Sequence, residues 1–261
     1  MTTAFAAWRG TRSGLAVALV TLWAAPAAIG AQDIGPALDP GIMVGWAGGD
    51  AVRQGFEQRS ATRAAPGVDV RSLMPNLGSQ PVGAVSDKQA AALDYRPSTA
   101  QRKANFARFV ERSRAADPQA AAALENLFAT NDVMAMADGW MKPYGMTATN
   151  VADASAVYLA TAWLATRGSA QDPDPSVMRG LRAQLVSAMT ATEDFRSATN
   201  AQKQELAEAM VVQALLVSQF VEAAKARPEL MAPVQQAVAR GARNAFGFDL
   251  QNMELTEQGL R

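Results

Sequence analysis

The sequence predicts an all-α fold: a single helical bundle of about six to seven helices, preceded by a signal peptide and a largely disordered Gly/Pro-rich segment. Three observations support this prediction. Apolar residues recur at every third or fourth position from residue 98 onward, which is the period of a helix. Helix caps and proline or glycine stops divide this pattern into segments. No alternation typical of strands is sustained in the same region.

Residues 1–31 have the layout of a secretory signal peptide. Arg9 and Arg12 form a positive region, an apolar core follows over 14–25, and small residues follow Pro26. The apolar core is shorter than the roughly 20 residues that a membrane helix needs. We therefore expect export by a Sec-type signal, cleavage within 27–31, and a periplasmic or secreted protein without a stable membrane span. An uncleaved anchor is the alternative.

Residues 32–97 are predicted to be a disordered or loosely docked linker. Glycine and proline interrupt this segment too often for a long helix, as at Gly35-Pro36 and Gly48-Gly49. The apolar cluster Ile42–Trp46 is unusual for a free tail, which leaves docking of this cluster on the helical part as an open alternative.

Residues 98–261 are predicted to form the helical domain, with helices that begin near residues 98, 118, 132, 150, 175, 199 and 228. Asp117, Asn131 or Asp132, and Thr149 or Asn150 are candidate N-caps. Thr199 with Gln202 matches a capping box, and Asn150 with Asp153 resembles one. The helix that begins near 199 is apolar on much of its circumference, which predicts a central position. Residues 248–260 are expected to lie extended across the bundle.

The composition excludes several kinds of chemistry. The chain has no histidine and no cysteine, so Cys–His and Ser–His–Asp nucleophiles, zinc sites built on Cys or His, and disulfides cannot form. Its 24 basic and 24 acidic residues balance, which gives no basis for binding nucleic acid. We expect no cofactor and no metal site. Asp172-Pro173-Asp174 begins like a calcium loop but lacks the later ligands, and it is typical of a rigid turn and helix cap.

One helix–loop–helix turn carries the candidate binding residues, Asp138, Trp140, Tyr144, Asn150 and Asp153. A polar pocket with aromatic walls, suited to a sugar or small polar ligand, is one interpretation. The structural interpretation is simpler, because Asn150 and Asp153 would cap a helix while Trp140 fills core. No catalytic residue is assigned.

A carboxylate-dependent hydrolase needs no histidine, so pairs of acidic residues are its candidates. These pairs are Glu125 with Asp132, Asp138 with Asp153, and Glu205 with Glu208. The last pair is expected to face solvent. The first helix is basic and is expected to present a solvated face, with binding of an anionic partner as the alternative; its basic residues are Arg102, Lys103, Arg108, Arg112 and Arg114.

Two motifs resemble a bacterial family of exported α-helical proteins whose function is unknown. The first motif is Tyr144-Gly145 followed by Asn150–Ala154, Tyr158 and Ala162-Trp163, and the second is the ending Leu255–Leu260. The resemblance covers about residues 100–261 and implies a helical fold and export, without an activity or ligand.

The expected function is therefore that of an exported soluble helical protein with a non-enzymatic binding role in the cell envelope. The expected partner is an unknown protein or envelope component. A hydrolase acting on cell-wall glycan and a small-ligand carrier are the alternatives.

Overall fold

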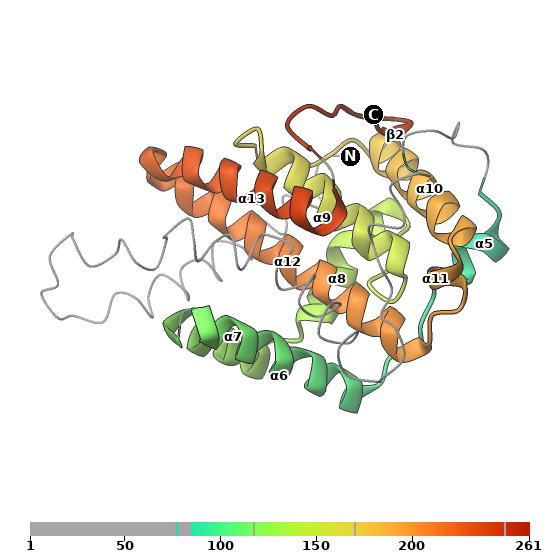
Figure 1. Ribbon diagram of the computed structural model, residues 1–261, viewed down its shortest axis with the longest axis horizontal. Coiled ribbons are helices and arrows are strands. Elements are labelled where there is room, and N and C mark those ends of the chain that lie inside the picture. Colours follow the sequence, from blue (N-terminus) through green and yellow to red (C-terminus); the bar gives the residue numbers. More distant parts are fainter. Residues whose placement is uncertain (1–76, 78–84, 117, 170, 248) are drawn as a thin grey trace, which may run out of the picture.

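The computed structural model describes residue 77 and residues 85–116, 118–169, 171–247 and 249–261. The signal peptide, the Ile42–Trp46 cluster and the Asp117 cap that the sequence predicts lie outside these residues. The all-α prediction is confirmed, and Figure 1 shows the helices gathered around α12. The α-helices are α5 (Asp87–Ala91), α6 (Thr99–Ala116), α7 (Pro118–Thr130), α8 (Val133–Met141), α9 (Val151–Ala165), α10 (Pro175–Ala191), α11 (Glu193–Arg196), α12 (Asn200–Ala226) and α13 (Met231–Phe246).

Short elements connect and complete this arrangement. The 3₁₀ turn η3 (Lys142–Tyr144) follows α8, and a second one, η4 (Pro228–Leu230), precedes α13. The strands β1 (Leu255–Thr256) and β2 (Gly259–Leu260) form an antiparallel hairpin. The long helices begin close to the predicted positions, and α8, α9, α10 and α12 begin at side-chain N-caps. Thr199 and Gln202 form the predicted capping box of α12, and Asp174 caps α10.

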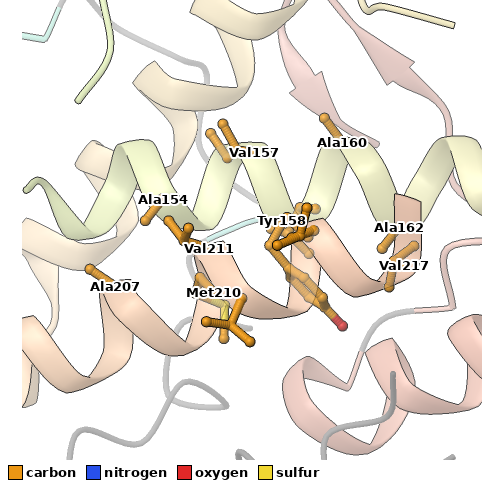
Figure 2. Packing of buried hydrophobic residues seen from close by; sticks show 14 of the residues in the cluster. Ala154, Val157, Tyr158, Ala160, Ala162, Ala207, Met210, Val211 and Val217 are labelled. Carbon is orange, nitrogen blue, oxygen red and sulfur yellow. The ribbon is translucent and has the colours of Figure 1, made fainter. Parts of the chain in front are cut away.

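The central position that the sequence predicts for α12 is confirmed. In Figure 2, α12 lies beside α9, with Ala154 close to Ala207 and Val211. Alanines on the facing sides allow this close approach, because a methyl group adds little to the distance between helix axes. By length and composition α12 could cross a membrane, but 72% of its most apolar window is buried inside the protein. The helix is accordingly the core of the bundle.

The folded unit begins earlier than residue 98, where the sequence places it. Leu93 and Tyr95 are 2% and 4% exposed. The Tyr95 amide donates to the carbonyl oxygen of Thr149 (2.9 Å), and the Val151 amide donates to that of Leu93 (3.1 Å). Residues 85–97 therefore pack against the start of α9. A five-residue helix and one short bridge leave no apolar period to read in the sequence.

The C-terminal hairpin packs on α10. The segment is extended, as the sequence predicts, but it folds back on itself, pairing Leu255 with Leu260. Gly180 of α10 makes room for the hairpin turn, since a Cβ atom there would lie 1.9 Å from the carbonyl oxygen of Glu257. This close approach places the hairpin turn directly on α10.

Candidate functional site

The loop between α8 and α9 is held by a carboxylate from each helix. Asp138 of α8 is half-buried, and its Oδ1 accepts hydrogen bonds from the Thr147 hydroxyl (3.0 Å) and from the Ala148 amide (2.7 Å). Asp153, in the first turn of α9, accepts from the Thr147 amide at 3.0 Å. Asp138 and Asp153 therefore both bind Thr147, which lies in the loop that joins their helices.

Asp153 is also part of a buried ion pair. Its side chain is 1% exposed, and Oδ1 accepts from Nε of Arg182 on α10 at 2.5 Å. Burial raises the pKa of Asp153 above its usual value, and the opposite charge and hydrogen bond of Arg182 counteract part of that increase. Both carboxylate oxygens have protein partners, so this group links α9, α10 and the preceding loop.

Asn150 confirms one predicted role and corrects another. Its Oδ1 accepts from the amides of Ala152 (3.0 Å) and Asp153 (3.1 Å), so it is the N-cap of α9. The predicted capping-box arrangement is wrong, because Asp153 turns to Thr147 and Arg182 instead of the Asn150 amide, which donates to the Thr147 carbonyl. A buried arginine partner that arrives from another helix is invisible in local sequence spacing.

The side-chain amide nitrogen of Asn150 binds residues 90–94 to the bundle. Its Nδ2 donates to the carbonyl oxygen of Ala90 at 2.9 Å and to Oδ1 of Asp94 at 2.7 Å. The side chain is 1% exposed, so both halves of this amide are used inside the protein. Asn150 therefore caps one helix and holds residues 90–94 at the same time.

The two aromatic site residues have separate positions. Trp140 is 6% exposed and belongs to the core, as the structural interpretation predicts. Tyr144 is half-buried in η3, and its hydroxyl donates to the carbonyl oxygen of Pro173 at 3.3 Å. Among the described residues, the structure thus unites Asp138, Asn150 and Asp153 through one loop. Ligand binding by these five residues stays a prediction.

A second buried polar cluster, which the sequence did not predict, joins α6 to α12. Glu208 is 1% exposed and accepts hydrogen bonds from Arg102 Nε (3.0 Å), Asn105 Nδ2 (2.6 Å) and Gln204 Nε2 (2.9 Å). Burial, and then the charge of Glu208, raise the pKa of nearby Tyr95. A carboxylate with three donors is held in place, which suits a structural link between helices.

The expectation that Glu205 and Glu208 form a solvated pair is wrong. Glu208 lies inside this cluster, while Glu205 pairs with Arg108 at 3.0 Å. The useful sequence signal is the spacing of Gln204 and Glu208, which places two polar residues one turn apart on the same side of a helix that is rich in apolar residues. Such a pair on a central helix indicates a polar contact with a neighbouring element.

The remaining carboxylate pair, Glu125 with Asp132, has no shared role in the structure. Glu125 is exposed and accepts from Arg114 at 2.9 Å, whereas Asp132 accepts from the Ala135 amide at 3.0 Å and caps α8. Neither contact indicates an acid–base pair.

The basic face expected on the first helix is largely neutralised. Arg102, Arg108 and Arg114 form ion pairs with Glu208, Glu205 and Glu125. Arg108 and Arg114 are exposed, as the expected solvated face requires, whereas Arg102 is part-buried and reaches the buried Glu208. In the part of the chain that the structure describes, no group of three or more acidic side chains is arranged to hold a metal ion.

The C-terminal segment contacts the end of α9 and the middle of α10. The guanidinium of Arg167 lies 3.8 Å from the ring centroid of Trp163, and both side chains donate to the carbonyl oxygen of Met253, at 2.7 and 2.9 Å. Gly259 has a φ of +93°, and a Cβ there would lie 2.2 Å from Oε1 of Gln184. The glycine of the ending is therefore required by both its backbone conformation and its close approach to α10.

Comparisons with characterised proteins and with solved structures gave no significant match. The match to a family model begins at residue 56, earlier than the resemblance in the sequence, and it includes the segment that packs against α9. The motif residues described above, from Tyr144 to the C-terminal hairpin, all lie within this match. The chain belongs to a family of unknown function (DUF6683), whose model matches residues 56–261.

Proposed function

We propose that the protein is an exported, non-enzymatic binding protein of the cell envelope. One observation carries the proposal: Asp153 and Glu208, which are 1% exposed, are each held by an arginine and by further donors from the protein. An acid–base catalyst must reach the proton that it transfers, at about 2.6–3.2 Å or through one water molecule. Carboxylates whose oxygens are committed inside the fold support a structural role instead.

Export is supported by the sequence of the N-terminal segment. The positive region, the short apolar core and the small residues that follow are those of a cleavable signal. The absence of cysteine and the dense apolar core fit a protein that keeps its fold in an oxidising compartment without disulfides.

The export proposal is tested by mass spectrometry of the native protein from fractionated cells. The expected result is a periplasmic or secreted chain whose N-terminus lies within residues 27–31. A full-length chain in the cytoplasmic fraction would contradict export.

The binding proposal places the partner contact in the N-terminal segment. The Ile42–Trp46 cluster supplies apolar residues that a binding segment can bury on contact. The helical bundle would then be the folded body that carries this segment.

A photo-reactive amino acid at position 46 tests this assignment in living cells. Position Lys103, which is exposed on α6, is the matched control. We expect a discrete crosslinked adduct in the envelope from position 46 and not from position 103. The absence of an adduct at position 46, or the same adduct from both positions, would contradict the assignment.

A hydrolase acting on cell-wall glycan has one observation in its favour. Burial raises the pKa of Asp153, as a general acid requires, and Asp138 approaches the same Thr147. Zymography on peptidoglycan, with Asp153→Asn and Glu125→Gln compared, distinguishes the two proposals. Clearing by the natural protein that is lost in Asp153→Asn would favour the hydrolase, provided that the variant remains folded.

A further inference from the structure

Gln184 of α10 binds two segments that are far apart in the sequence. Its Nε2 donates to the carbonyl oxygens of Leu77 (2.5 Å) and Leu260 (2.8 Å), and its Oε1 accepts from the Leu260 amide (2.9 Å). The side chain is 5% exposed. Both amide hydrogens are therefore used, one on each segment, in a place where water does not easily replace a lost partner.

The C-terminal partner fits this amide closely. Leu260 is 1% exposed, and its amide and carbonyl, which face away from β1, are both bound by Gln184. The neighbouring Gly259 has no room for a Cβ beside Gln184, and Gly180 has none beside the hairpin turn. A side-chain amide thus closes the outer edge of β2, which would otherwise present unpaired backbone groups.

The N-terminal partner is anchored in the same place. Leu77 is 3% exposed and belongs to the same core cluster as Leu260. It lies within the family match, as do residues 85–97, which pack against α9. Its contact with Gln184 therefore joins the early part of the family domain to the end of the chain.

We infer that Gln184 couples the docking of Leu77 to the closure of the C-terminal hairpin. When Leu77 leaves, one buried Nε2 hydrogen loses its acceptor, and a buried unsatisfied donor is costly. The amide then gains by turning toward solvent, which removes its two bonds to Leu260. Because such coupling is reciprocal, opening of the hairpin also weakens the docking of Leu77.

The consequence is a conformational link between the two ends of the domain. A partner that binds the N-terminal segment and withdraws Leu77 would loosen the hairpin at the opposite end of the chain. The coupling itself needs no partner, so its test is independent of the proposed function.

Amide hydrogen exchange of Arg261, measured by NMR on the full mature chain, tests the coupling. This amide donates to the Glu254 carbonyl at 2.9 Å and reports closure of the hairpin. In Leu77→Ala, and more so in Leu77→Asp, we expect exchange at Arg261 to accelerate at least about fivefold, the lower end of typical coupling between sites. Leu124→Ala, a core truncation in the distant α6–α7 pair, is the control and should change this exchange less than Leu77→Ala does.

A second background makes the result specific to Gln184. In Gln184→Met, the hairpin has already lost the amide, so adding Leu77→Ala should leave the Arg261 exchange rate within about twofold of the Gln184→Met rate. An unchanged Arg261 rate in both Leu77 variants would overturn the inference. An equal acceleration by Leu77→Ala with and without Gln184 would also overturn it, because the coupling would then bypass the amide.

Discussion

Three buried polar side chains of this protein each join elements that are distant in the sequence. Asp153 holds α9, α10 and the 142–150 loop, Glu208 holds α6 to α12, and Asn150 caps α9 while binding residues 90–94. Each of these groups is about 1% exposed. Since an unsatisfied buried polar group costs about 1–3 kcal/mol, such complete pairing specifies how the helices meet.

Replacing Arg182 with methionine is expected to destabilise the protein by about 3 kcal/mol at neutral pH, because it leaves the buried Asp153 carboxylate without its counter-charge. Arg179→Met, which removes an exposed arginine on the same helix, is the matched control and should change stability little. Urea unfolding followed by circular dichroism measures both free energies. Equal effects of the two variants would contradict the importance of the buried pair.

The cost of Arg182→Met should also depend on pH. The folded-state pKa of Asp153 is raised, so the stability from this group is fully present below its unfolded pKa and is lost as the pH rises through the folded value. Loss of Arg182 raises that pKa further. The difference in unfolding free energy between variant and natural protein should therefore shrink as the pH is lowered and the raised pKa of Asp153 lets it bind a proton in the folded state. If Asp153 were not the cause, the difference in unfolding free energy between Arg182→Met and the natural protein would stay constant as the pH is lowered.

At the residue scale, the sequence predicted roles that depend on local spacing and missed those that depend on distant partners. Asn150 was identified as a cap from its position before an apolar run. Its contacts with Ala90 and Asp94 come from a segment about 60 positions away, and the Asp153–Arg182 pair spans two helices. No local pattern carries such information.

At the scale of elements, glycine positions show where close packing replaces local preference. Gly180 lies within α10 and meets the backbone of Glu257, while Gly139 of α8 has open space around its Cβ position. In an isolated helix, replacing either glycine with alanine would increase stability, because glycine costs about 1 kcal/mol relative to alanine. At Gly180, the contact with Glu257 makes the change to alanine destabilising instead.

Gly180→Ala is expected to destabilise the protein by about 1–3 kcal/mol, because the new methyl group displaces the hairpin turn. Gly139→Ala is expected to stabilise it, by up to about 1 kcal/mol. Thermal and urea unfolding of the two variants measure this contrast. A stabilising Gly180→Ala would show that the hairpin is not packed on α10 as described.

The long helices were predictable, and the short elements were not. The helices from α6 to α10, together with α12 and α13, are long enough for an apolar period to appear, and α8, α9, α10 and α12 also have side-chain N-caps. By contrast, α5 and α11 have five and four residues, too few for a period to appear. The hairpin was predicted only as an extended segment, because its register depends on its contacts with α10.

At the scale of the whole molecule, one hydrophobic cluster runs from Leu77 to Leu260. Tyr158 of α9 and Phe246 of α13 stack within this cluster, with ring centroids 5.7 Å apart, and both are 0% exposed. Burial of aromatic side chains contributes strongly to stability. A single cluster that includes both ends of the described chain implies that the domain unfolds as one unit.

Phe246→Ala should lower the free energy of unfolding by about 3–5 kcal/mol through the cavity that it leaves. The unfolding midpoints measured by far-ultraviolet circular dichroism and by tryptophan fluorescence should shift by the same amount and stay equal to each other. Separate midpoints for the two signals would indicate independently unfolding parts and contradict the single core.

The residues of the candidate site could be predicted from the sequence, but the contacts that determine their role could not. The sequence located Asp138, Asn150 and Asp153 in one turn, and the structure brings them together around Thr147. Capping chemistry favoured a structural interpretation of Asn150. The decisive facts, the complete burial of Asp153 and the arrival of Arg182, follow from how α9 and α10 pack.

The central claim is that buried polar residues hold the helices together, and a double-mutant cycle on Asp153 and Arg182 tests it most directly. Unfolding free energies are measured for Asp153→Asn, Arg182→Met and the double variant. We expect the double variant to be destabilised by about 2 kcal/mol less than the sum of the single changes, because each single change leaves a partner unpaired. Additivity within about 0.5 kcal/mol would contradict the claim.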